Sequence, residues 1–184
     1  MRRWAVSLLL MGNITSASAA CDGAWDWVHM ACDRLVDTYQ NGENQLLLSG
    51  YAWHTPWTWT AERRAEENSN AWGAGWARSV DRPDDITDTV YFLVFSDSHS
   101  KPQYNLGYGW STYWGKRSGL QGGLGYTLML VARNDIFNGW PFPAVLPLVS
   151  VRYDKVTVYG TYIPSVGGVN NGSVVYIFGK IALD

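Results

Sequence analysis

The chain carries little charge for its length. Of its 184 residues 16% are charged, and the formal net charge at pH 7 is −2. Soluble domains usually contain about 25% charged residues, and a protein that binds nucleic acid through its phosphates needs an excess of lysine and arginine. The composition therefore predicts no nucleic-acid partner and is unusual for a soluble domain.

A long apolar run is also missing after the N-terminus. A spanning helix needs about 20 consecutive apolar residues, so a protein of this kind that lives in a membrane must cross it with strands. Aromatic residues and glycine are abundant instead, with 11 Trp, 11 Tyr and 19 Gly. With so few charges, this composition is typical of a β-barrel that has rings of aromatic side chains at both membrane interfaces.

The N-terminus has the pattern of a secretory signal peptide. It opens with a basic pair, continues with a short apolar stretch and ends in a zone of small residues at 15–20. This pattern predicts a signal peptide over residues 1–19, with cleavage after Ala19 or after Ala20. The mature chain is therefore expected to be exported.

Cysteine is scarce, with only Cys21 and Cys32 in the chain. In an exported protein the two could form a disulfide. They could not do so within one straight helix, because eleven residues at about 1.5 Å each would hold them about 16 Å apart.

Residues 20–44 are predicted to contain a periplasmic-side amphipathic helix, from Asp22 to Gln40. Its apolar residues follow helical spacing, Asp22 can cap its start, and Gly42 can end it. Two compatible interpretations exist. The helix packs on its own domain, or it lies at the membrane interface with its tryptophans at headgroup level.

The remaining chain, residues 45–184, is predicted to be all-β. The expected strands are 45–55, 71–81, 87–97, 103–114, 120–132, 144–153, 155–163 and 173–183. Short turns alternate with mostly longer loops, which is typical of a small eight-stranded antiparallel transmembrane β-barrel. Lipocalins share the strand count but are soluble carriers without a wide lipid-facing surface.

This topology brings polar residues to one rim. With a periplasmic N-terminus, odd strands run outward, so His54, Asp97 with Ser98, and Arg133 all arrive at the extracellular rim. Arg133 is expected to support the site formed by the other three. His29 and His99 are expected to be surface residues.

Two prolines interrupt the predicted ladders. Pro147 lies early in the sixth strand and Pro164 just beyond the seventh. Neither can donate a ladder hydrogen bond, so the wall between these strands is expected to open near its outer end. The alternative is that both occupy ordinary strand ends, where proline is tolerated.

Several motifs, spread over about 140 residues in a fixed order, together resemble one family. They are Ala52-Trp53-His54, Trp72-Gly-Ala-Gly75, Asp97-Ser98, Gly107-Tyr-Gly-Trp110, Leu146-Pro-Leu148, Thr161-Tyr-Ile-Pro164 and Asn170-Asn-Gly172. The chain resembles the outer-membrane lipid A palmitoyltransferases.

The resemblance implies an acyltransferase in the outer membrane of a Gram-negative bacterium, with its active site at the extracellular face. It implies transfer of a palmitoyl chain from the sn-1 position of a phospholipid to the N-linked hydroxyacyl chain of the proximal glucosamine of lipid A, without cofactor or metal, by a monomer. The family's essential catalytic positions fall on His54, Asp97 and Ser98. The floor of its acyl-chain pocket falls on Gly109, and its lateral lipid access falls on Pro147 and Pro164.

The chain departs from the family at several places. Ser49 and Ala71 stand where the family has a second proline pair, so a second gap is not implied. Asp88 replaces a family histidine, and the last residue, Asp184, is not the usual terminal aromatic.

The chemistry can also be judged from the residues alone. His54 is a natural general base, Asp97 could orient it, and Ser98 could be a nucleophile or an oxyanion donor. Because neighbouring residues on a strand point to opposite faces, Asp97 and Ser98 can serve one site only if the strand ends before them. Alternatively, His54 activates the lipid A hydroxyl for direct attack.

Gly109 lies about seven residues below the corner, which places it roughly 16 Å inside a tilted barrel. That depth is close to the length of a long acyl chain. The alternative is that this glycine only relieves crowding in a small barrel.

Two other functions are compatible with the fold. One is a non-catalytic barrel that serves as an anchor or adhesin. The other is a phospholipase, in which water replaces lipid A as the acceptor.

Overall fold

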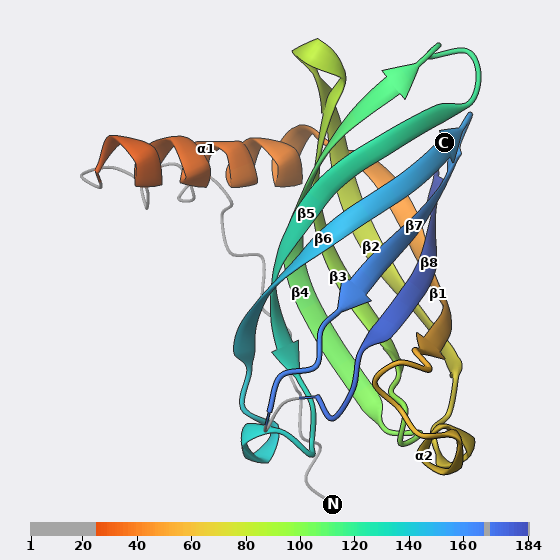
Figure 1. Cartoon of the computed structure of the whole chain (residues 1–184). Helices are drawn as coiled ribbons and strands as arrows, with labels where there is room; N and C mark the ends of the chain where they lie inside the picture. Colours follow the sequence, from red (N-terminus) through yellow and green to blue (C-terminus); the bar gives the residue numbers. More distant parts are fainter. Residues whose placement is uncertain (1–24, 168–169, 184) are drawn as a thin grey trace, which may run out of the picture. The chain divides into compact units, whose positions relative to one another are not determined.

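The eight predicted strands form one closed antiparallel barrel. The computed structural model describes residues 25–167 and 170–183. Each strand pairs with its neighbour in sequence, and β8 pairs with β1, so the sheet closes on itself (Figure 1). The strands are β1 (Glu43–His54), β2 (Asn70–Arg82), β3 (Ile86–Ser96), β4 (Pro102–Gly115), β5 (Gln121–Ala132), β6 (Phe142–Tyr153), β7 (Val156–Ile163) and β8 (Val174–Ala182). The predicted fold is confirmed, and every predicted strand boundary lies within two residues of the observed one.

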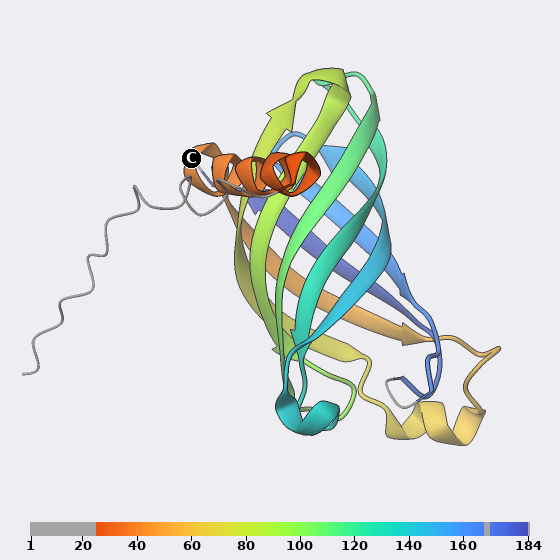
Figure 2. The ribbon, with the colours of Figure 1, turned by 90° about the vertical axis from the view of Figure 1, so that its left-hand side faces the viewer.

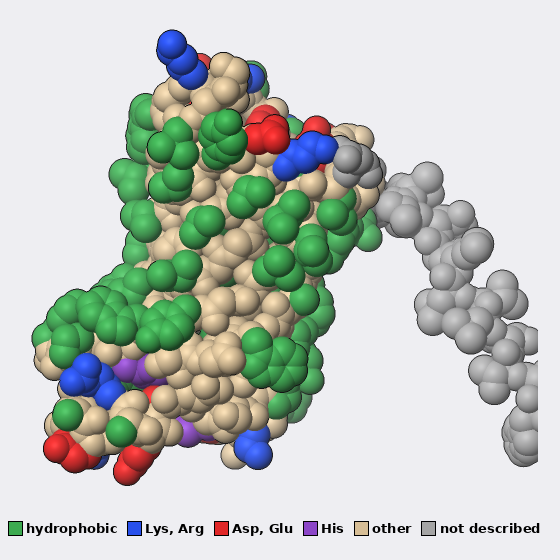
Figure 3. Space-filling view, turned by 90° about the vertical axis from the view of Figure 1, so that its right-hand side faces the viewer, with side chains coloured by type: hydrophobic (Ala, Val, Ile, Leu, Met, Phe, Trp, Pro, Cys, Tyr) green, Lys and Arg blue, Asp and Glu red, His purple; other side chains and the backbone are tan. Residues whose placement is uncertain are grey.

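Side chains alternate between the lumen and the outer surface, as strand geometry requires. In β6, Val149 and Val151 are half exposed on the outside, whereas Ser150 is buried in the lumen. Figure 3 shows hydrophobic side chains spread over the outer surface of the barrel. An apolar outside with polar groups within suits a barrel surrounded by lipid.

The lumen near the short turns is filled with paired polar groups. Tyr113 is fully buried, and its Oη lies 3.2 Å from Tyr159 Oη, while Arg152 donates to Gln121 Oε1 at 3.0 Å. Lys180 is also buried and donates to Ser79 Oγ at 3.0 Å. A buried charge is costly without partners. These contacts therefore allow polar side chains to fill the lumen in this half of the barrel.

The predicted N-terminal helix is observed as α1 (Asp26–Asn41). Its last turn closes on Gly42, whose N–H donates to the Thr38 carbonyl at 3.1 Å. Cys32 takes part in a disulfide bond, while Cys21 and the predicted signal peptide lie outside the described residues. Among the helices that the structure describes, none is long and apolar enough to cross a membrane.

The connections divide between the two ends of the barrel. One end carries the short turns, including η2 (Pro83–Asp85). The other end carries four connections that are mostly longer, among them α2 (Ala61–Glu66) and η3 (Phe137–Gly139), which lie at the same end in Figure 2. We call this second end the loop rim, formed by residues 55–69, 97–101, 133–141, 164–167 and 170–173.

Candidate active site

His54 is the last residue of β1 and is buried at the loop rim, with 3% of its surface exposed. Its Nε2 lies 2.9 Å from Ser98 Oγ, and its Nδ1 lies 3.4 Å from Ser69 Oγ. The edge of the imidazole packs on Trp59 at a centroid distance of 5.2 Å. The ring is therefore held on three sides, with one nitrogen directed at a hydroxyl that lines a cavity.

Trp59 is itself fixed by the opposite loop. Its Nε1 donates to the Ser173 carbonyl at 3.0 Å. Next to Ser173, a Cβ added to Gly172 would come within 2.3 Å of the Trp59 ring. Only glycine fits there, so the Asn170-Asn-Gly172 motif acts through Trp59 to seat the imidazole.

Strand β3 ends at Ser96, and residues 97–101 form a tight turn. The Asp97 N–H donates to the Lys101 carbonyl at 2.8 Å, and the Ser100 N–H donates to the Asp97 carbonyl at 3.0 Å. The alternation of faces is thus interrupted before Asp97 and Ser98. This geometry allows both side chains to serve one site.

The Asp97 carboxylate organises this turn. Its Oδ1 accepts the backbone N–H of His99 at 2.9 Å and of Lys101 at 2.8 Å, and its Oδ2 lies 3.8 Å from Arg133 Nη2. Within the described chain these are its contacts, and none goes to His54. The group on Nδ1 of His54 is Ser69, which the sequence interpretation did not name.

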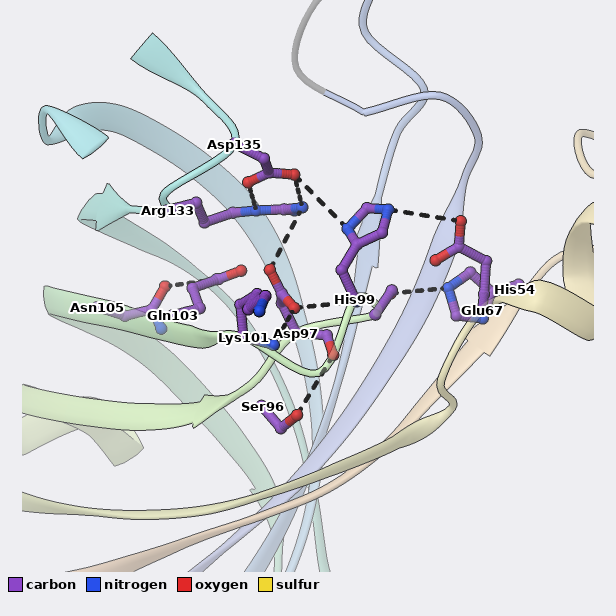
Figure 4. Close-up of polar contacts among 11 residues, drawn as sticks. His54, Glu67, Ser96, Asp97, His99, Lys101, Gln103, Asn105, Arg133 and Asp135 are labelled. Carbon is purple, nitrogen blue, oxygen red and sulfur yellow. Dashed lines mark hydrogen bonds and ion pairs between the residues drawn. The ribbon is translucent and has the colours of Figure 1, made fainter. Parts of the chain in front are cut away.

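Arg133 links the turn to the third loop. It donates from Nε and Nη2 to the two oxygens of Asp135 at 3.0 and 2.7 Å. Burial raises the pKa of the Asp135 carboxyl, but the hydrogen bonds and charge of Arg133 outweigh this and hold the pKa below its usual value. Figure 4 shows the guanidinium between Asp135 and Asp97.

This arrangement bears on metal binding. Among the described residues, Asp97, His99 and Asp135 come close enough together to be considered as cation ligands. However, the guanidinium of Arg133 lies beside both carboxylates and supplies the positive charge there. We therefore treat this group as an ion-pair network and not as a metal site.

A cavity of about 360 Å³ opens below Ser98. Its mouth is polar and includes Ser96, Asp97, Ser98 and Arg133. Deeper in the lumen the lining becomes mostly hydrophobic, with Leu93, Phe95, Met129, Leu146, Tyr176 and Phe178. A polar mouth over an apolar interior suits a molecule with a reactive polar group and a hydrocarbon tail.

Gly109 lines a second, smaller cavity of about 30 Å³. Tyr91, Thr127, Leu148 and Phe178 line both cavities and separate them. A Cβ added to Gly109 would lie 3.9 Å from Leu148 Cδ1 and from Thr89 Cβ, which is ordinary contact. Gly109 therefore lies directly under the partition, and a long side chain there would press on it.

The barrel wall is interrupted between β6 and β7. Their ladder begins at Leu148 and Thr161, although β6 pairs with β5 as far as Phe142 and β7 pairs with β8 as far as Ile163. Pro147 is the first residue beyond the ladder, and Pro164 follows β7 directly. We call this unpaired part, residues 142–147 facing 162–164, the β6–β7 seam.

The cavity reaches the β6–β7 seam. Residues of the seam line it, including Pro143, Val145, Leu146, Ile163 and Pro164. The hydroxyl of Thr161 donates to the Pro147 carbonyl at 2.7 Å, so one contact bridges the seam at its lower end. The two prolines therefore border an interruption of the wall at the depth of the cavity.

The wall between β1 and β2 differs. Ser49 pairs with Gly73 in the ladder, and its hydroxyl bonds the Ala71 carbonyl and lies 2.5 Å from Tyr176 Oη. The two residues that replace the family's second proline pair thus join the strands. The register shifts between Ser49 and Tyr51, and pairing resumes at Tyr51 and Asn70.

Sequence reasoning missed the contributions of the loops. Ser69 and Trp59 hold His54, and Glu67 and His99 meet beside Ser98. Glycine at 172 is a signal for the packing of Trp59, but no local pattern pointed to the other three.

Comparisons with known proteins show the family of the chain. A family model described as antimicrobial peptide resistance and lipid A acylation protein PagP matches residues 34–180. The lipid A acyltransferase PagP of Bordetella pertussis (strain Tohama I) is 37% identical over 167 residues, which cover 91% of each chain. Those of Methylobacillus flagellatus and Legionella pneumophila are 35% and 33% identical, over 90% and 91% of this chain and 89% of each relative.

Among solved structures, Neisserial surface protein A has some likeness to this chain. The sequence identity is 16% and the TM-score 0.39, over 76% of this chain and 95% of that one.

Proposed function

The chain belongs to the PagP family of lipid A acylation proteins, and from this premise we propose that His54 and Ser98 are the catalytic centre of its acyl transfer. It is a lipid A acyltransferase with a β-barrel of the Gram-negative outer membrane. The donor is a phospholipid and the acceptor is lipid A. We propose that the transferred group is a palmitoyl chain taken from the sn-1 position.

One observation carries the assignment of the site. His54 Nε2 lies 2.9 Å from Ser98 Oγ at the mouth of an apolar cavity. A general base must lie within hydrogen-bond reach of the proton that it takes, and this pair meets that condition. The cavity offers a place for the acyl chain, with its ester near Ser98.

The reaction exchanges one ester for another. The ester bond between the acyl carbonyl and the sn-1 oxygen breaks, and a bond forms between that carbonyl and the lipid A hydroxyl oxygen. His54 takes the proton of the attacking hydroxyl and returns it to the departing lysophospholipid oxygen. In this scheme Ser98 either attacks first, as an acyl carrier, or donates a hydrogen bond to the oxyanion.

Asp97 has a positioning role in this scheme. It shapes the turn that presents Ser98, because its carboxylate holds the N–H groups of His99 and Lys101. Arg133 supports that carboxylate from the third loop. Neither residue needs to touch the reacting atoms.

The remaining features concern access and chain length. The β6–β7 seam beside Pro147 and Pro164 is the proposed lateral entrance for lipid, since it joins the cavity to the lipid-facing side. Gly109, under the cavity partition, is the proposed acyl-chain ruler. The loop rim is proposed to face outward, and the protein to act as a monomer.

The test is transfer of labelled palmitate. Refolded protein is mixed with sn-1-labelled phospholipid and lipid A, and products are separated by chromatography. Wild type is expected to place label on lipid A, and His54→Ala to lower the rate by about 10²-fold to 10⁴-fold, the usual contribution of a general base. Unchanged transfer by His54→Ala would contradict the proposed site, and label found only in free fatty acid would indicate a phospholipase.

A further inference from the structure

His99 lies beside Ser98, between two carboxylates from different loops. Its Nε2 is 3.9 Å from Glu67 Oε1, and its Nδ1 is 3.6 Å from Asp135 Oδ2. Glu67 directly follows α2 in the first loop, and Asp135 belongs to the third. Figure 4 shows the imidazole bridging the two, so one side chain of the second loop connects three loops of the rim.

The two carboxylates match the two N–H donors of a protonated imidazole. A neutral imidazole has one N–H, whereas the protonated ring can donate from both nitrogens, and here each nitrogen faces a carboxylate. The Glu67 side chain is 13% exposed, and its Oε2 is buried without a hydrogen-bond partner among the described residues. Its charge therefore needs a nearby cation.

The other charged groups around His99 are accounted for. Asp97 receives the His99 N–H, and Arg133 is paired with Asp135. Burial lowers the pKa of His54, while the charge of Glu67 raises it and that of His99 lowers it. Lys101 ends the same turn and is exposed. Among these groups His99 is the one that faces both Glu67 and Asp135.

This contact is coupled to the catalytic pair through the backbone. Asn68, the neighbour of Glu67, donates its N–H to the Ser98 carbonyl at 2.8 Å and its side-chain amide to Ser100 Oγ at 3.3 Å. On the other side, Arg133 joins Asp135 to Asp97. A shift of either outer loop would therefore move the turn that carries Ser98.

We propose that His99 is a positioning residue of the acyl transfer, whose protonated ring joins Glu67 to Asp135 and so holds Ser98 against His54. This inference rests on the proposed roles of His54 and Ser98. It makes the assembly of the site depend on pH, with the joined state present at low pH and lost as the ring deprotonates.

Three variants test the idea by initial rates of labelled acyl transfer. His99→Gln removes the charge, His99→Lys makes it permanent, and His29→Gln is the matched control, because His29 is also exposed and paired with an aspartate on α1. Rates are measured from about pH 5.5 to about pH 8, on either side of the ordinary histidine pKa of about 6.5. The titration of His54 is followed in each enzyme by NMR of its imidazole, and each rate is divided by the fraction of neutral His54, because the charge at residue 99 also acts on that ring.

At the acidic end, the transfer rate of wild type is expected to exceed that of His99→Gln by roughly threefold to tenfold. This is the range that two partly exposed ion pairs would give. The ratio of the two rates should fall towards one at the alkaline end. His99→Lys should exceed His99→Gln by a similar factor at every pH, and His29→Gln should match wild type. A ratio that does not vary with pH, or a Lys variant no faster than Gln, would overturn the inference.

A measurement without catalysis separates this idea from the proposed function. In micelles, the backbone amide NMR resonances of Glu67, Asn68 and Asp135 should shift as the pH is changed, with one common midpoint in wild type. This common pH step should be absent from His99→Gln. If the step is absent while His54→Ala abolishes transfer, the positioning role fails and the catalytic assignment stands. If the step is present while His54→Ala still transfers, the catalytic assignment fails instead.

Discussion

Asp97 and Ser98 are neighbours with different environments. The carboxylate of Asp97 turns back onto its own loop and holds two backbone N–H groups, whereas the hydroxyl of Ser98 reaches His54. His54, Asp97 and Ser98 lie at the same rim, but they do not form a chain of hydrogen bonds that runs from the carboxylate through the imidazole to the hydroxyl. The hydrogen-bond partner of His54 Nδ1 is Ser69, a neutral side chain, and the nearby Glu67 acts on the imidazole through its charge.

Gly109→Met is expected to shorten the acyl chain that the enzyme selects. Its added atoms would fill the 30 Å³ cavity and press on Leu148, which also lines the larger one. Excluding two methylenes costs about 1.6 kcal/mol at about 0.8 kcal/mol each, which shifts the preference between chain lengths by roughly tenfold. Mass spectrometry of lipid A acylated from a mixture of donors measures this shift.

Gly109→Ala is the matched control, because a lone Cβ meets only ordinary contacts at 3.9 Å and should keep the wild-type preference. If the methionine variant folds fully and selects the same chain as wild type, Gly109 is not the ruler.

At the scale of elements, the sequence predicts the strands well and the loops poorly. Each strand carries its own evidence, since its faces alternate and a turn or loop bounds it, and the prolines already indicated where β6 and β7 separate. The contact of Ser69 with His54 joins two segments that meet only in the folded barrel. Such contacts depend on tertiary packing and leave no periodic signal, so the sequence could place the catalytic pair at one rim but not name its supports.

The β6–β7 seam can be closed in a test of lipid entry. Pro147→Cys with Tyr162→Cys places two thiols where the ladder would continue beyond Leu148 and Thr161. Bridging them with a short bifunctional thiol reagent is expected to reduce the rate of palmitate transfer by about 10-fold or more, because lipid must then enter by another route. An added barrier of about 1.4 kcal/mol lowers a rate tenfold. The measured quantity is the initial rate before and after bridging.

The control places the same bridge within the ladder, at Val151→Cys with Val158→Cys, which are register partners on the outer surface. Both pairs are made with Cys21 and Cys32 changed to serine, so that only the new thiols react. Equal rates for the two bridged proteins would contradict entry through the seam.

At the scale of the whole molecule, the barrel is divided along its axis. The end with short turns has a lumen filled by Tyr113, Tyr159 and Lys180, while the loop-rim end has the cavity and the catalytic pair. A lipid could therefore be processed at one end only. The distribution of loop lengths indicates that this end faces out of the cell, since outer-membrane barrels have short periplasmic turns and longer extracellular loops.

Orientation can be measured with two lysines, one at each end. Lys101 lies in the turn after β3 and Lys116 in the turn after β4, and both are exposed. Lys101→Cys is expected to react with a bulky maleimide that cannot cross the outer membrane when intact cells are treated. Lys116→Cys should react only after the membrane is permeabilised, because the short-turn end faces the periplasm.

Both variants are made with Cys21 and Cys32 changed to serine, and labelling is read as a mass shift. If Lys116→Cys is the one labelled in intact cells, the barrel is inverted, and the catalytic pair cannot meet lipid A in the outer leaflet.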